Sequence, residues 1–270
     1  MISGDADYAV RVNSTARIAA DGLLLAGGGR AILLQIAHPD VARGVARHSD
    51  FRQRPMDRLR GTLRFVYAEV LGTDEDRRRV RRAVGAAHRP VREAATSERP
   101  GYSAFDPELQ LWVAATLYET TVTVHEKVWG RLGPAEADAL YRDYAVLGTG
   151  LQMPAELWPA DRAAFARYWS ERLNALSVSD EARAVAQDLL HPARPWWLRP
   201  LMPFAGLLTT ALLDDRLRRA FALPDGPRRR AREARAWRLV AAVWRRLPRR
   251  LRELPHRMIL RGLRRDGAAA

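Results

Sequence analysis

The 270-residue sequence contains no cysteine. This absence excludes disulfides, iron–sulfur clusters, cysteine-ligated zinc, a thiolate nucleophile and covalently attached c-type haem. Lysine is also nearly missing, because Lys127 is the only one and every other basic side chain is an arginine. Together with the abundant alanine, this usage is typical of GC-rich coding DNA. Arginine content alone is therefore weak evidence for a polyanionic partner.

Long hydrophobic runs are missing too. The most apolar stretch, residues 196–213, is interrupted by Arg199, Pro200 and Pro203, whereas a membrane-spanning helix needs about 20 consecutive apolar residues. Residues 1–12 show no basic segment followed by an apolar core, the pattern of a secretory signal peptide. We therefore expect a cytoplasmic protein.

Acidic residues are scarce in the C-terminal part of the chain. Of the net charge of +14, residues 228–270 contribute +12, from 15 arginines and three acids. Trp237, Val240 and Trp244 share one helical face of this tail, opposite the arginines. We expect that face to pack on the body, as amphipathic helices of globular proteins usually do. Peripheral contact with a membrane or an acidic partner stays open, and a nucleic-acid partner is not expected.

Helical periodicity dominates the sequence, and no convincing alternation of the kind found in strands is present. The predicted helices cover residues 14–25, 30–38, 41–48, 55–71, 74–95, 108–129, 134–147, 159–176, 179–190, 204–222 and 228–247. The composition, 47% hydrophobic, is enough for a large core. With no repeat and no flexible linker, we predict an all-α fold. It is a single multi-helix globular domain over residues 1–270, with basic amphipathic helices over 228–270 packed on the body.

His88 occupies an unusual place in the predicted helix over residues 74–95. It lies on an apolar stripe with Val80, Val84 and Val91, whereas the rest of the helix is mostly arginine. The imidazole should therefore point into the protein, where an unpaired polar group costs about 1–3 kcal/mol. A hydrogen-bonded core histidine is the commoner outcome. A metal ligand is the alternative.

Familiar catalytic and metal-binding motifs fail on their spacing. The glycine run at 27–29 has neither the spacing of a dinucleotide loop nor the lysine of a P-loop. His125 and Glu126 begin like a zinc-protease motif, but Trp129 stands where the second histidine ligand should be. A di-iron bundle would need Glu-x-x-His pairs on two facing helices, and the sequence has none.

One pairing of helices remains. Arg58 precedes Thr62 by one turn in the predicted helix over 55–71, at the edge of its apolar stripe. A short turn at residues 72–73 would pack this helix antiparallel to the one that carries His88. An imidazole opposite a guanidinium and a hydroxyl fits a flat cofactor with one axial imidazole, in a haem-sized apolar pocket between helices. An ordinary helix pair with Arg58 reaching solvent is the alternative, and spacing alone does not favour haem.

At these residues the sequence resembles a known family. The matching blocks are Ala26–Arg30, Leu33–Phe51 (LLQIAHPDVARGVARHSDF), Arg58–Thr62 (RLRGT), His88, Gly101–Leu117 (GYSAFDPELQLWVAATL) and Leu247–Pro255 (LPRRLRELP). In order and spacing they are similar to bacterial and fungal haem oxygenases. That family includes the latex-clearing rubber oxygenases and the oxygenase of mycophenolic acid biosynthesis. The resemblance covers nearly the whole chain.

The resemblance implies an all-α fold that holds haem b. His88 matches the proximal iron ligand, and Arg58 and Thr62 match distal-side residues that matter for activity in the rubber-cleaving branch. Arg58 would stabilise bound dioxygen or a haem propionate, and Thr62 would donate a hydrogen bond to dioxygen. Two positions depart from the family pattern. Gly61 stands where rubber-cleaving members have a lysine, and Ala114 stands where many small members have a histidine.

Other residues in the matched blocks are candidates for the same site. His38 and Tyr102 are candidate cofactor-binding residues, and Asp106 lies in the block that contains Tyr102. We interpret His38 and Asp106 first as capping or packing residues, with a role in the site as the alternative. Trp112 is interpreted as a core residue rather than a wall of the cofactor site.

The resemblance favours a haem b-dependent oxygenase that uses dioxygen on a small apolar substrate, isoprenoid or otherwise alkene-containing. The alternative is a non-catalytic helical protein that binds haem or a hydrophobic ligand, for which Gly61 and Ala114 are the motivating departures. A third hypothesis is a helical protein that docks on membranes or acidic partners through its arginine-rich tail.

Overall fold

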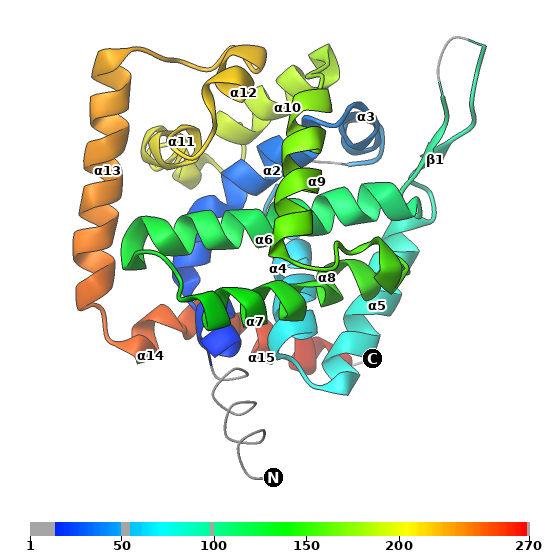
Figure 1. The fold of residues 1–270 in the computed structure, drawn as a ribbon, viewed down its shortest axis with the longest axis horizontal. Coiled ribbons are helices and arrows are strands. Elements are labelled where there is room, and N and C mark those ends of the chain that lie inside the picture. Colours follow the sequence, from blue (N-terminus) through cyan, green and yellow to red (C-terminus); the bar gives the residue numbers. More distant parts are fainter. Residues whose placement is uncertain (1–13, 50–54, 98–99, 269–270) are drawn as a thin grey trace.

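The computed structural model describes residues 14–49, 55–97 and 100–268. Its centre is α6 (Pro107–Trp129), which crosses the middle of the molecule with other helices on several sides of it (Figure 1). Leu111 and Ala115 on one side of this helix, and Val124 on the opposite side, are all buried. A helix that is apolar all round must be covered all round, and this places α6 in the core.

The remaining elements surround α6. Those before it are η1 (Gly22–Gly27), α2 (Gly28–Ile36), α3 (Pro39–His48), α4 (Pro55–Leu71), α5 (Asp74–His88), β1 (Arg92–Glu93) and β2 (Tyr102–Ser103). Those after it are α7 (Pro134–Tyr144), α8 (Val146–Thr149), η2 (Ala155–Leu157), α9 (Arg162–Ala175), α10 (Asp180–Leu190), η3 (Trp196–Leu198), α11 (Met202–Thr210), α12 (Asp215–Ala220), α13 (Pro227–Arg246), α14 (Arg249–Arg252) and α15 (Leu254–Ala268). The fold is all-α and forms a single multi-helix globular domain, as predicted.

Several helix boundaries differ from the prediction. Residues 55–71 form α4 as expected, but residues 134–147 are divided into α7 and α8. Residues 204–222 are likewise divided into α11 and α12. The second break has a local cause, because the Asp214 carboxylate caps α12 by accepting a hydrogen bond from the Leu217 amide at 2.7 Å.

The helix that carries His88 is shorter than predicted. We expected it to continue to residue 95, but α5 ends at His88 itself. Pro90 has no amide hydrogen with which to extend the helix, and Val91 instead enters a hairpin, where its carbonyl accepts a hydrogen bond from Ala104 at 2.9 Å. In this antiparallel hairpin Arg92 of β1 lies opposite Ser103 of β2. His88 therefore stands at the end of a helix and not in its middle.

Helices α4 and α5 pack against each other across the two-residue connection at 72–73. Thr73 and Asp76 form a capping box, in which the Thr73 hydroxyl accepts from the Asp76 amide at 3.2 Å and the Asp76 carboxylate accepts from the Thr73 amide at 3.0 Å. Two turns later, Arg81 donates two parallel hydrogen bonds to Glu69 of α4, at 2.8 and 2.7 Å. These contacts fix α5, and hence His88, relative to α4.

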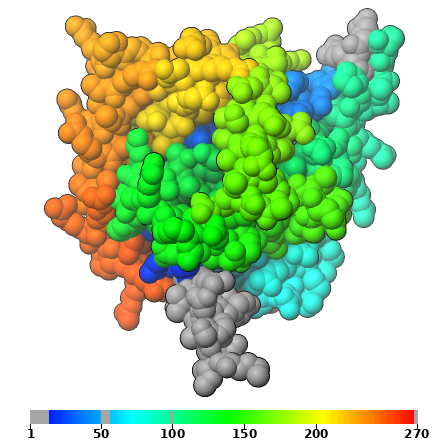
Figure 2. All heavy atoms as spheres, in the orientation of Figure 1, coloured from blue at the N-terminus to red at the C-terminus, as the bar shows by residue number. Residues whose placement is uncertain are grey.

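The C-terminal helices contact the body of the protein. The indole of Trp237 on α13 donates to the Leu208 carbonyl at 3.1 Å, and that of Trp244 donates to Asp21 at 2.7 Å. Helix α15 packs on α4. Helix α13 forms one edge of the molecule (Figures 1 and 2). In the described parts of the chain, no helix combines the length and apolar character needed to cross a membrane.

Candidate functional site

His88 ends α5 with its ring half-buried, and not fully buried as the apolar stripe predicted. The imidazole packs edge-on against Phe105, with ring centroids 6.3 Å apart and an interplanar angle of 80°. Within the described chain, no hydrogen bond reaches either ring nitrogen. The ring therefore keeps both nitrogens free for a ligand.

Arg58 of α4 lies near enough to His88 for its charge to act on the imidazole. Its side chain remains open to solvent, yet the surrounding protein removes enough water to lower the pKa of the guanidinium below its ordinary value of 12.5. Arg58 has no acidic partner among the described residues, whereas an arginine in such a setting usually has one.

The part of α4 near Arg58 leaves apolar surface uncovered. Leu63, Val66 and Val70 of the predicted stripe pack on the main core, but Leu59, at the other end of the same stripe, is exposed. Phe105, which contacts the His88 ring, is also exposed. An exposed leucine next to Arg58 in the sequence and an exposed phenylalanine against the His88 ring suit an apolar ligand.

Two glycines stand beside open space in the same pair of helices. A Cβ added to Gly61 of α4, or to Gly85 of α5, would meet no described atom within 4 Å. Thr62 follows Gly61, is exposed, and lies one turn beyond Arg58. The hydroxyl, the guanidinium and the imidazole thus belong to one helix pair, as the sequence predicted.

Two causes lower the pKa of His88 below its ordinary value of 6.5. Burial is the larger, because it disfavours the charged ring, and the positive charge of Arg58 acts in the same direction. The imidazole is therefore neutral at pH 7, with a lone pair available for a metal ion.

In the ligand-free protein we expect His88 to titrate below pH 6.5, and Arg58→Gln to move its pKa upward by removing one of the two causes. NMR spectra of the imidazole across a pH series measure both values. Arg60→Gln is the matched control, because Arg60 is an exposed arginine of α4 paired with Asp57 at 4.0 Å. If the Arg60 variant moved the pKa as far as the Arg58 variant, the assignment to Arg58 would be wrong.

His38 and Tyr102 lie in a second group around α3, and no contact in the described chain joins them to the His88 ring. His38 is the N-cap of α3, where its Nδ1 accepts from the Asp40 amide at 3.3 Å. Tyr102 is buried, with the Arg43 guanidinium 5.0 Å from its ring centroid. A cofactor-binding role for these two residues stays a prediction.

The remaining candidates have structural roles in the described chain. Asp106 caps α6 by accepting from the Glu108 amide at 2.8 Å. Trp112 is buried, stacks on Trp169 with centroids 5.3 Å apart, and donates to the Leu34 carbonyl at 3.2 Å. Both agree with our first interpretation. Sequence reasoning missed Phe105 as a neighbour of His88, although it lies in the matched block 101–117.

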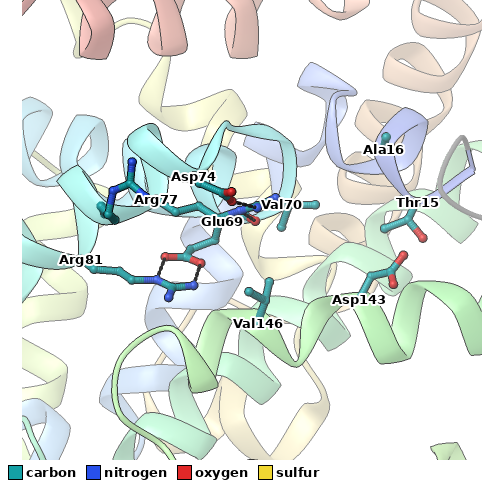
Figure 3. Close-up of a pocket in the computed structure, with 10 residues that line it drawn as sticks. Thr15, Ala16, Glu69, Val70, Asp74, Arg77, Arg81, Asp143 and Val146 are labelled. Carbon is teal, nitrogen blue, oxygen red and sulfur yellow. Dashed lines mark hydrogen bonds and ion pairs between the residues drawn. The ribbon is translucent and has the colours of Figure 1, made fainter.

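Two cavities of the described chain lie away from His88. One, of about 520 Å³, is lined by charged residues of α4 and α5, including Glu69, Asp74, Arg77 and Arg81 (Figure 3). Figure 3 shows that its carboxylates and guanidiniums are largely paired with one another, as in the double bond from Arg81 to Glu69. Another, of about 800 Å³, lies along α13. The predicted haem-sized pocket is neither of these, and it stays a prediction.

Comparison with known proteins decides the family. The model of the family described as "ER-bound oxygenase mpaB/B'/Rubber oxygenase, catalytic domain" matches residues 16–246. The chain belongs to this family. Two curated relatives of this chain are uncharacterized proteins of Mycobacterium tuberculosis and Mycobacterium bovis. Each is 40% identical over 193 residues, which cover 69% of this chain and 75% of the relative.

A solved structure of latex clearing protein in its closed state has the same fold as this chain. The match has a TM-score of 0.53 at 19% identity, and it covers 93% of this chain and 74% of the other. The resemblance inferred from the sequence is therefore confirmed. Membership of a family of oxygenases supports an oxygenase role.

Proposed function

We propose that the protein is a haem b-dependent oxygenase that uses dioxygen on a small apolar substrate, isoprenoid or otherwise alkene-containing. The observation that carries the proposal is a neutral imidazole, His88, near Arg58, an arginine without an acidic partner among the described residues, on two packed helices. Family membership supplies the reaction class.

The residues present suit haem. In the part of the chain that the structure describes, no cluster of three histidine or carboxylate side chains could hold a metal ion by itself. A single imidazole suffices when a porphyrin provides four nitrogen ligands to the iron. His88 would hold the iron, and exposed Leu59 and Phe105 would cover the apolar macrocycle.

Arg58 and Thr62 would supply the polar contacts. A guanidinium matches a propionate carboxylate in shape and charge, and such a pair would satisfy the desolvated Arg58. Thr62 has a hydroxyl that can donate a hydrogen bond to dioxygen and hold it in place. Haem, when bound, supplies the redox-active iron at which dioxygen is activated.

Gly61 gives a reason to keep the non-catalytic alternative. Rubber-cleaving members have a lysine at this position, whereas Gly61 has no side chain, and a Cβ built there would meet no described atom within 4 Å. Gly61 therefore supplies no positive charge at this position. A haem or hydrophobic-ligand binder that performs no oxygenation would need no such charge.

Reconstitution with haem tests both functions. We expect protein expressed with a haem precursor to show a Soret band and to consume oxygen with squalene, but not with its saturated counterpart squalane. A Soret band without oxygen uptake across a panel of isoprenoid alkenes would favour the non-catalytic alternative. Protein that stays colourless with ample haem would overturn both.

A further inference from the structure

The outer face of α13 combines positive charge with exposed apolar side chains. Its inner face, which includes Ala236 and Trp237, is buried against the body. Leu239, which lies about opposite Trp237 around the helix axis, is 56% exposed, and Val243, one helical turn beyond Leu239, is 51% exposed. Arg235 precedes Leu239 by one turn and is exposed as well.

The arginines of this outer face lack acidic partners. Arg232, Arg235 and Arg238 form no ion pair in the described chain. The arginine run of α5 is a useful contrast, because there Arg77, Arg78, Arg79 and Arg81 are each paired with a carboxylate. The charges of Arg232, Arg235 and Arg238 are therefore available to an external anion, whereas the four arginines of α5 already contact carboxylates.

A groove lies beside these arginines, between α13 and the end of α6. It measures about 800 Å³, and its charged lining residues are Lys127, Arg238, Arg245 and Arg246, with no acid among them. Trp237 and several alanines provide the rest of its wall. Such a groove suits an anionic headgroup that carries an apolar portion.

We propose that α13 docks the protein on a membrane that contains anionic phospholipid. The arginines attract the negatively charged surface, the groove receives a phosphate headgroup, and Leu239 and Val243 enter the interfacial region. These apolar side chains favour a bilayer over a nucleic acid, because a phosphate backbone has no apolar surface for them to contact. The body covers most of the tryptophan side of the helix, and Trp237 also forms part of the groove wall.

Co-sedimentation with vesicles tests the proposal without haem. We expect the protein to bind vesicles of equal parts phosphatidylglycerol and phosphatidylcholine, and to bind phosphatidylcholine alone weakly. Arg235→Gln with Arg238→Gln should weaken binding roughly 10- to 30-fold, since each arginine near an anionic surface contributes about fivefold. Leu239→Gln with Val243→Gln should also weaken binding, and should do so even in high salt, which screens the charges.

The matched control removes the same charge from another surface. Arg142→Gln with Arg167→Gln changes exposed arginines of α7 and α9 that have no acidic partner in the described chain, and it should leave vesicle binding unchanged. Equal loss in this control would show that net charge alone drives binding. Binding of duplex DNA but not vesicles, or no effect of the Leu239 and Val243 changes, would also overturn the proposal. Circular dichroism checks that every variant is folded.

Discussion

Replacing His88 with alanine is expected to abolish the Soret band of protein reconstituted with haem. The substitution removes the ring that we propose as the axial ligand, and the residues around it offer no second imidazole. Because changes in residues that merely orient a metal ligand already weaken metal binding 10- to 100-fold, loss of the ligand should weaken haem binding by more than about 100-fold. Absorption spectra during haem titration measure the effect.

Other histidines of the chain are engaged elsewhere or lie on other elements. His38 caps α3, and His256 contacts the Ala20 carbonyl through its Nδ1 at 3.1 Å. His191 is exposed at the end of α10, which makes His191→Ala the matched control. It should keep the full Soret band, and added free imidazole should partly restore the band in His88→Ala. An unchanged band in His88→Ala would exclude this residue as the ligand.

The pH dependence of haem binding has a defined sign. Because burial and the Arg58 charge lower the pKa of His88, the ring stays neutral at pH values where an ordinary histidine is already protonated. Protons therefore compete with iron for His88 only below pH 6.5. Haem binding should persist from neutral pH down past that value and then weaken as the pH falls further.

The α4–α5 pair could be predicted from local signals. Pro55 opens one helix, Gly72 follows its end, and Thr73 with Asp76 begins the next through a capping box. The end of α5 was missed because Val91 continues the helical spacing past His88. In the structure Val91 packs near Gly44 of α3, a contact that no local pattern encodes.

The environment of His88 could be predicted only in part. The stripe on α4 placed Arg58 and Thr62 correctly on one helix, because one-turn spacing is a property of any helix. That Arg58 is desolvated and without a partner depends on distant segments, as does the approach of Phe105. Such contacts arise from tertiary packing, which cannot be predicted from the periodicity of apolar residues.

The contacts of Glu233 in the C-terminal region likewise could not be predicted from periodicity. The sequence presents it as the one acid within the arginine-rich helix at 227–246, a signal that we did not use. In the structure it is buried and receives two hydrogen bonds from Arg218 of α12, at 2.8 and 2.9 Å. Thr210 of α11 donates to the same carboxylate at 2.7 Å. This network, together with the tryptophan face, holds α13 to the body.

Arg218→Met is expected to destabilise the protein by up to about 3–5 kcal/mol, because it removes both Arg218 bonds and leaves the buried Glu233 carboxylate only the Arg229 contact at 3.2 Å as a cationic partner. The two side chains are only 3% and 4% exposed, so water cannot replace the lost bonds. Urea unfolding followed by circular dichroism measures the loss. Arg230→Met is the matched control on α13, since its pairs with Asp215 and Asp225 are exposed and should contribute little to stability.

A double variant and a pH series separate pairing from packing. Arg218→Met with Glu233→Leu removes both charges, so it should be more stable than Arg218→Met alone. Although burial favours the neutral carboxyl, hydrogen bonds from Arg218 and Thr210 hold the pKa of Glu233 below 4.5 in the native protein. The native pair therefore stabilises the fold above that pH and loses this contribution as the pH falls. In Arg218→Met, burial should raise the pKa of Glu233, so the carboxyl is protonated more readily and no longer carries a buried charge. The difference in free energy of unfolding between the native protein and Arg218→Met should therefore become smaller in acid. If this difference stayed constant with pH, or if the double variant were no more stable than Arg218→Met, the loss of stability would be assigned to packing.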